Sequence, residues 1–216
     1  MRPGQPTFAA YIRGRFSLCF LPRLLPMPTD FLPSARKQFA YYKLLGEQTL
    51  AQVPDAALSW QPDPASNSLA TIVKHLAGNL RSRWTDIFTT DGEKPDRNRE
   101  TEFDNDLPTR AAVLAAWETG WQCLFQTLDA LTEADLGRVI YIRNQGHTVL
   151  EALNRQLAHY PYHVGQMVFL GKLIQGEAWL SLSIPRGGSA AFNAEKFARA
   201  PHRAHFTDEA RPDAGR

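Results

Sequence analysis

The chain has 216 residues, of which 44% are hydrophobic and 21% are charged. These values are close to those of globular proteins and exclude a wholly disordered or fibrous chain. The two cysteines, Cys19 and Cys123, form no CxxC pair, which excludes a disulfide framework and a thiolate zinc cluster and favours a cytoplasmic location. The chain contains no apolar run of about 18 residues, the length that a membrane-spanning helix requires, so no membrane partner is expected.

The charge is distributed unevenly along the chain. Residues 1–29 hold four of the 24 basic residues and none of the 22 acidic ones, so the remaining chain carries slightly more acid than base. A body without excess positive charge predicts no nucleic-acid partner. Residues 1–28 fit neither a secretory signal nor a transit peptide. A disordered extension and a translation start at Met27 remain open, and we favour Met27 because the helix caps Thr29 and Asp30 follow it.

Four long stretches with apolar residues at helical spacing follow the N-terminal segment. They predict helices over about 30–52, 67–88, 109–131 and 148–175, the last between a capping box and Gly176. The segments between them predict a polar loop over 89–108, a short turn at 132–135, an extended piece at 139–143 and a turn at 144–146. A short helix near 190–200 and a polar tail over 201–216 complete the chain. We therefore expect an all-α, antiparallel four-helix bundle over 29–200, with connections long enough that an up-down topology is not forced.

The histidines are the clearest chemical signal in the sequence. His159 and His163 are four residues apart on one helix, so their side chains share one face. His75 borders the apolar stripe of the helix over 67–88. If these two helices are neighbours, the three imidazoles can converge on one divalent ion and leave positions open for water or substrate. The competing interpretation is a hydrogen-bonded histidine pair without metal. The remaining histidines are expected in solvent: His147, His202 and His205.

Three further features bear on such a site. Pro161 lies between the two histidines and predicts a kink that either opens the site or spoils their spacing. Asn79, one turn after His75, is a candidate for orienting a metal-bound group. The charged loop over 89–108 has two interpretations: a solvated surface loop, which we favour, and a rim on which Arg97 or Arg99 binds an anionic substrate. Cys123 is expected to be a buried, inert thiol.

Three long stretches of the chain resemble the DinB/YfiT-like superfamily, and within it a bacterial branch known as a domain of unknown function. They are NSLATIVKHLAGNLRSRWTDIFTTDGEKPDRNRETEF, TVLEALNRQLAHYPYHVGQMVFLGKLI and SLSIPRGGSAAFN. The resemblance covers about 30–197. It implies a four-helix bundle in which three histidines hold a divalent metal, commonly zinc or nickel. The family's ligand positions correspond to His75, His159 and His163 here, and dimers are common, so a homodimer is expected.

The resemblance also implies a reaction class. Characterised members include metal-dependent thiol transferases and isomerases that use bacillithiol, mycothiol or glutathione. The leading hypothesis is a transferase in which a metal-activated thiol attacks a small electrophile; a hydrolase that activates water is related to it. The rival hypotheses are a non-catalytic stress-related or metal-binding bundle and a purely structural dimer. Pro161 and Asp96 depart from the family pattern, which has a small residue and an aromatic residue at these positions.

Overall fold

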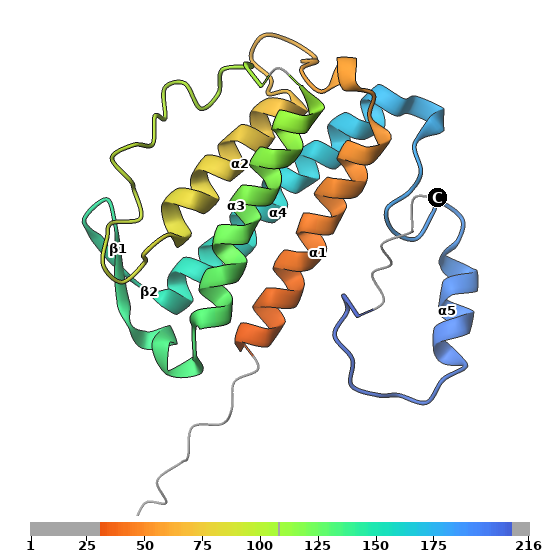
Figure 1. Ribbon diagram of the computed structural model, residues 1–216. Coiled ribbons are helices and arrows are strands. Elements are labelled where there is room, and N and C mark those ends of the chain that lie inside the picture. Colours follow the sequence, from red (N-terminus) through yellow and green to blue (C-terminus); the bar gives the residue numbers. More distant parts are fainter. Residues whose placement is uncertain (1–30, 108, 209–216) are drawn as a thin grey trace, which may run out of the picture.

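The computed structural model describes residues 31–107 and 109–208, so the predictions for residues 1–28 and for Met27 lie outside the described residues. Four helices form a bundle (Figure 1): α1 (Phe31–Gln52), α2 (Leu69–Trp84), α3 (Arg110–Ala130) and α4 (Val149–Gln175). The smaller elements are β1 (Val139–Ile142), β2 (Gln145–Thr148) and α5 (Ser189–Phe197). The predicted all-α fold class is confirmed. Among the described helices, none has both the length and the apolar character that crossing a bilayer requires.

Local capping explains where the helices begin and end. The Ser68 side chain caps α2, and Thr148 forms the expected capping box with Glu151 at the start of α4. Gly176 ends α4 with a φ of 55°, as predicted. The helix α2 ends four residues earlier than predicted, because Thr85 is already extended, with a ψ of 128°, and Asp86 then adopts a φ of 48°.

The four helices do not simply alternate in direction along the chain, an arrangement that the long connections had left open. Arg110, at the start of α3, donates to the carbonyls of Leu50 and Val53 at the end of α1. The Thr127 hydroxyl, near the end of α3, donates to the carbonyl of Trp84 at the end of α2. The end of α4 likewise bonds to the end of α1 through the Gln175 side chain. Thus α2 and α3 are parallel, as are α1 and α4, and the long connection over 85–109 makes this possible by returning the chain to the other end.

Aromatic side chains from three helices meet at the centre of the core. Phe39 of α1, Trp121 of α3 and Tyr160 of α4 are buried, with ring centroids between 5.7 and 6.4 Å apart. The Tyr160 hydroxyl accepts from Trp84 Nε1 at 2.9 Å and donates to Asn79 Oδ1 at 3.1 Å, both on α2. This hydrogen-bonded core therefore fixes α4 against α2 next to the histidines.

A two-residue hairpin holds the beginning of the charged loop. Arg143 and Asn144 both have positive φ, as a type I′ turn requires, so the turn lies one residue earlier than predicted. The Asp91 carboxylate accepts from the backbone N–H groups of both residues at 2.8 Å. Gly92 N donates to Tyr141 O at 2.8 Å. The loop over 89–107 is thereby attached to the hairpin.

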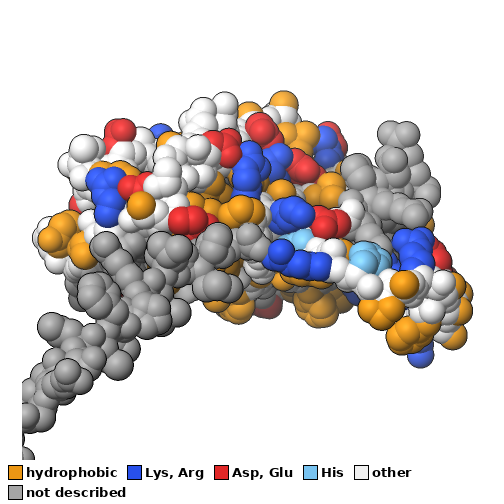
Figure 2. Space-filling view, turned by 90° about the horizontal axis from the view of Figure 1, so that it is seen from below, with side chains coloured by type: hydrophobic (Ala, Val, Ile, Leu, Met, Phe, Trp, Pro, Cys, Tyr) orange, Lys and Arg blue, Asp and Glu red, His pale blue; other side chains and the backbone are white. Residues whose placement is uncertain are grey.

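The C-terminal segment was expected to be a solvated tail, and its described part instead returns to α1. Lys37 forms an ion pair with Asp208 at 2.5 Å, and Ser34 Oγ lies 3.1 Å from His205 Nε2. The helix α5 lies outside the four-helix bundle and contributes no buried residue (Figure 1). On the face seen from below in Figure 2, acidic and basic side chains are intermixed, with hydrophobic side chains between them.

The contact between α2 and α3 depends on the absence of a side chain at Gly120. A Cβ atom at this position would lie 2.8 Å from the Cα of Ala77. Because that neighbour is backbone, no rotamer change relieves the overlap. Gly165 on α4 is the matched control, since a Cβ there would meet no atom within 4 Å.

We expect the two substitutions to alanine to have opposite effects on the free energy of unfolding. Gly120→Ala should lower it, because overpacking of a core costs roughly 1–3 kcal/mol and exceeds the gain in helix propensity. Gly165→Ala should raise it by up to about 1 kcal/mol through that propensity alone. Denaturant titration of both variants measures the difference. Equal stabilisation by both would contradict the close approach of α2 and α3.

Candidate metal centre

The three predicted histidines converge, although they come from two helices far apart in sequence. His75 lies on α2 and is buried, and His159 and His163 lie on α4 and are partly exposed. One ring nitrogen from each lies within 4.8 Å of the others. The Nε2 atoms of His159 and His163 are 3.2 Å apart. The helix α4 continues through Pro161, so the proline does not prevent the two rings from meeting.

Two glutamine side chains orient the histidines of α4. The Nδ1 of His159 bonds to Gln156 Oε1 and that of His163 to Gln166 Oε1, each at 2.9 Å. An amide oxygen only accepts, so each Nδ1 carries the proton and each neutral ring keeps a lone pair on Nε2. Burial and the neighbouring His163 lower the pKa of His159 to about 4, and burial also lowers the pKa of His163. Two unprotonated nitrogens therefore face each other across a short distance.

A buried carboxylate from the charged loop orients the third histidine. His75 Nδ1 donates to Glu102 Oε2 at 2.9 Å, and Arg97 donates to both oxygens of Glu102 at 2.8 Å. Burial alone would raise the pKa of Glu102, but the hydrogen bonds from His75 and Arg97 lower it to about 2. Gly78, one turn after His75, makes room for this carboxylate, because a Cβ atom there would overlap Glu102 Oε1.

The two arginines predicted to form an anion-binding rim have different environments. The Arg97 side chain is 3% exposed and donates to both oxygens of Glu102, so it lies inside the protein rather than at an exposed rim. Its charge instead compensates a carboxylate inside the protein. The Arg99 side chain is 43% exposed and lies 3.7 Å from Glu93, so it stays at the surface. The exposed Asp96 pairs with Arg81 at 2.6 Å.

Asn79 is buried one turn from His75 and belongs to the hydrogen-bonded core. Its Oδ1 accepts from the Tyr160 hydroxyl at 3.1 Å, and Tyr160 follows His159 directly in α4. The oxygen is therefore occupied by a core partner rather than directed at a bound group. Through Tyr160, Asn79 helps to hold the two helices of the site together.

Two aromatic rings that the sequence did not single out touch the histidines. Phe103 stacks on His75 with ring centroids 4.9 Å apart and an interplanar angle of 24°. The Tyr162 ring meets His163 edge-on at 5.0 Å. Their exposed fractions are 44% and 63%. The one signal that pointed to Phe103 is its place as a lone aromatic residue in a charged loop, directly after Glu102.

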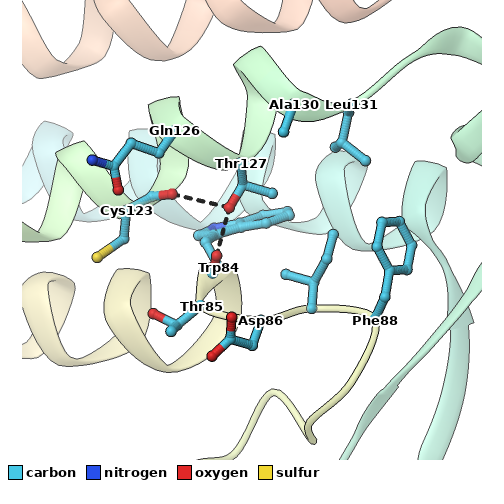
Figure 3. Close-up of a pocket in the computed structure, with 10 residues that line it drawn as sticks. Trp84, Thr85, Asp86, Phe88, Cys123, Gln126, Thr127, Ala130 and Leu131 are labelled. Atoms are coloured by element: carbon cyan, nitrogen blue, oxygen red, sulfur yellow. Dashed lines mark hydrogen bonds between the residues drawn. The ribbon is translucent and has the colours of Figure 1, made fainter.

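A separate pocket of about 310 Å³ lies between the end of α2 and α3, and the three histidines are not part of its lining (Figure 3). Trp84, Phe88 and Leu131 contribute apolar walls. The Thr127 hydroxyl, drawn at the centre of Figure 3, donates to the carbonyls of Trp84 and Cys123. Cys123 was expected to be buried, and it is half-buried. The Thr127 hydroxyl is thus already bonded within the protein.

Removing the cation beside Glu102 should destabilise the fold strongly. In Arg97→Met the buried carboxylate loses its bidentate partner, and we expect the free energy of unfolding at neutral pH to fall by about 3–5 kcal/mol. Adding Glu102→Gln to this variant should recover part of the loss, since the buried charge is then removed. Arg81→Met is the control, because its pair with Asp96 is more than half exposed and should contribute less than about 1 kcal/mol. Similar losses in Arg97→Met and Arg81→Met would refute a buried pair.

Comparisons with known proteins place the chain in a family. A family model described as "Protein of unknown function (DUF1572)" matches residues 27–188. A crystal structure of a conserved protein from Enterococcus faecalis has a TM-score of 0.52 and 20% identity, over 70% of this chain and 99% of the other; this likeness shows the fold alone. The curated proteins include no significant match. The match to the family model extends over the bundle and all three histidines, and the chain therefore belongs to the DUF1572 family.

Proposed function

We propose that His75, His159 and His163 hold one divalent metal ion, which serves thiol-dependent group transfer to a small electrophile. The observation that carries the metal site is the arrangement of the ring nitrogens. On each of the three rings, Nδ1 bonds to an oxygen of Glu102, Gln156 or Gln166. Such partners are typical of metal-binding histidines, because they fix the tautomer and direct Nε2 toward the ion.

The spacing of the donors supports the same conclusion. Two imidazole ligands of a tetrahedral zinc ion, each about 2.05 Å from the metal, are about 3.3 Å apart. The Nε2 atoms of His159 and His163 are 3.2 Å apart. Without a shared cation, two facing lone pairs repel each other, whereas an ion between them turns the same geometry into an attraction. Imidazole donors suit zinc and nickel alike.

Three protein ligands leave coordination positions for an exogenous group. A divalent ion held there would lower the pKa of a bound thiol or water and so supply a nucleophile at neutral pH. The protein's own contribution is orientation: Glu102 and Arg97 fix His75, and Gln156 and Gln166 fix the other two rings. A fold does not by itself establish a reaction. The proposal of a thiol therefore rests on the resemblance to the DinB/YfiT-like superfamily and not on the geometry of the site.

Metal analysis tests the ligand set. Protein purified without a histidine tag and loaded with zinc or nickel should hold about one ion per chain, as three convergent imidazoles imply. His159→Ala and His163→Ala should lose the ion. His205→Ala should keep it, because His205 bonds to Ser34 and Thr207 and is not part of the cluster. Mass spectrometry gives the stoichiometry. A parent protein that stays free of metal after loading would reject the site.

Turnover tests the reaction class. Metal-loaded protein should accelerate the conjugation of glutathione or another small thiol with an aryl halide, forming a carbon–sulfur bond and releasing halide and a proton. His159→Ala should lose this acceleration, and His205→Ala should retain it. Chromatographic detection of the thioether measures the rate. A filled metal site without turnover across a panel of thiols and electrophiles would favour a non-catalytic metal-binding bundle instead.

A further inference from the structure

The histidine cluster is bordered by two exposed aromatic rings from separate elements. Phe103 belongs to the loop over 89–107 and stacks on His75. Tyr162 belongs to α4 and packs edge-on against His163. We propose that these two rings form a recognition surface for an apolar, preferably aromatic, group of the substrate. This inference rests on the proposed function, since it assigns the substrate class of the same metal site.

Most charged groups near the cluster are directed inward and paired; the exposed exception is Arg155, one turn before His159 on α4. The side chains of Arg97 and Glu102 are 3% and 4% exposed and bond to each other. Arg83 is 5% exposed and donates to Gly92 O and to Glu93. These three buried groups compensate one another inside the protein and are not exposed to a substrate, which leaves Arg155 as the exposed cation next to His159. Among the described side chains that make a hydrogen bond or a ring contact with the three histidines, Phe103 and Tyr162 are the exposed ones.

The Phe103 ring is also held in place before any ligand arrives. Its neighbour in the chain, Glu102, is fixed by the hydrogen bonds from His75 and Arg97. The ring is thus ordered by the same contacts that orient His75, and a ligand that stacks on it does not have to order it. Aromatic rings offer a large apolar surface and prefer offset or edge-to-face partners. A ligand group next to the metal-binding atom would therefore meet two exposed aromatic rings.

Binding of thiols to cobalt-loaded protein tests the assignment without turnover. Cobalt(II) in a histidine site reports a bound thiolate through a charge-transfer absorption band. The probes are benzyl mercaptan, 2-mercaptoethanol and 3-mercaptopropionate, which are aromatic, neutral polar and anionic. We expect benzyl mercaptan to bind more tightly than 2-mercaptoethanol, with an aromatic contribution of about five- to tenfold in Kd. The ratio of the two Kd values, compared between variants, removes the intrinsic difference between the thiols.

Two variants and one matched control identify the surface. Phe103→Ala and Tyr162→Ala should each reduce the preference for benzyl mercaptan while the visible cobalt spectrum shows the metal still bound. Phe206→Ala is the control, because this exposed ring also stacks on a histidine, His205, at 4.9 Å, but outside the cluster. It should leave the ratio unchanged. Phe103 and Tyr162 lie on separate elements. If one variant fails to fold, the other variant therefore still tests the aromatic surface.

Three results would overturn the inference in distinguishable ways. An unchanged Kd ratio in both Phe103→Ala and Tyr162→Ala would reject the aromatic surface while the metal site stands. Tightest binding of 3-mercaptopropionate, lost in Arg99→Ala or in Arg155→Ala, would replace it with an anion-binding rim. Absence of a charge-transfer band with every thiol, despite bound cobalt, would reject thiol binding, and with it both the proposed reaction and the recognition surface.

Discussion

The candidate site depends on one buried carboxylate, that of Glu102. It accepts from His75 on α2 and from Arg97 in its own loop, and these donors hold its pKa at about 2 despite burial. Such a charge is tolerated inside a protein only when its partners are in place. The loop over 89–107 therefore has a fixed position in the fold. It places Arg97, Glu102 and Phe103 next to α2, and Asp91 attaches its beginning to the hairpin.

The same principle, an acceptor for each histidine, recurs on α4 with neutral groups. Gln156 and Gln166 lie three residues before His159 and three after His163, so each amide reaches its ring within one turn of helix. One ring of the cluster is thus oriented by a charged group from a loop and two by amides from their own helix. The difference matters for variants. Replacing Arg97 leaves the buried charge of Glu102 without its partner, whereas replacing Gln156 or Gln166 leaves no unpaired charge.

The direction of the helices decides whether these parts meet. Because the long connection over 85–109 makes α3 parallel to α2, the loop passes along the bundle and can deliver Glu102 to the middle of α2. The core then sets the distance between the two histidine-bearing helices through the bonds from Trp84 to Tyr160 and from Tyr160 to Asn79. A shorter antiparallel connection would leave His75 without its carboxylate.

The sequence by itself determined the helices, their caps and the three histidines, because helical periodicity, capping boxes and i, i+4 spacing are local properties. Only the tertiary structure decided that Arg97 is buried, that Asn79 serves the core, that Phe103 stacks on His75 and that the tail returns to α1. Each of these depends on contacts between segments that are distant in sequence. The sequence of a charged loop does not indicate whether its charges face water or pair with one another inside the protein.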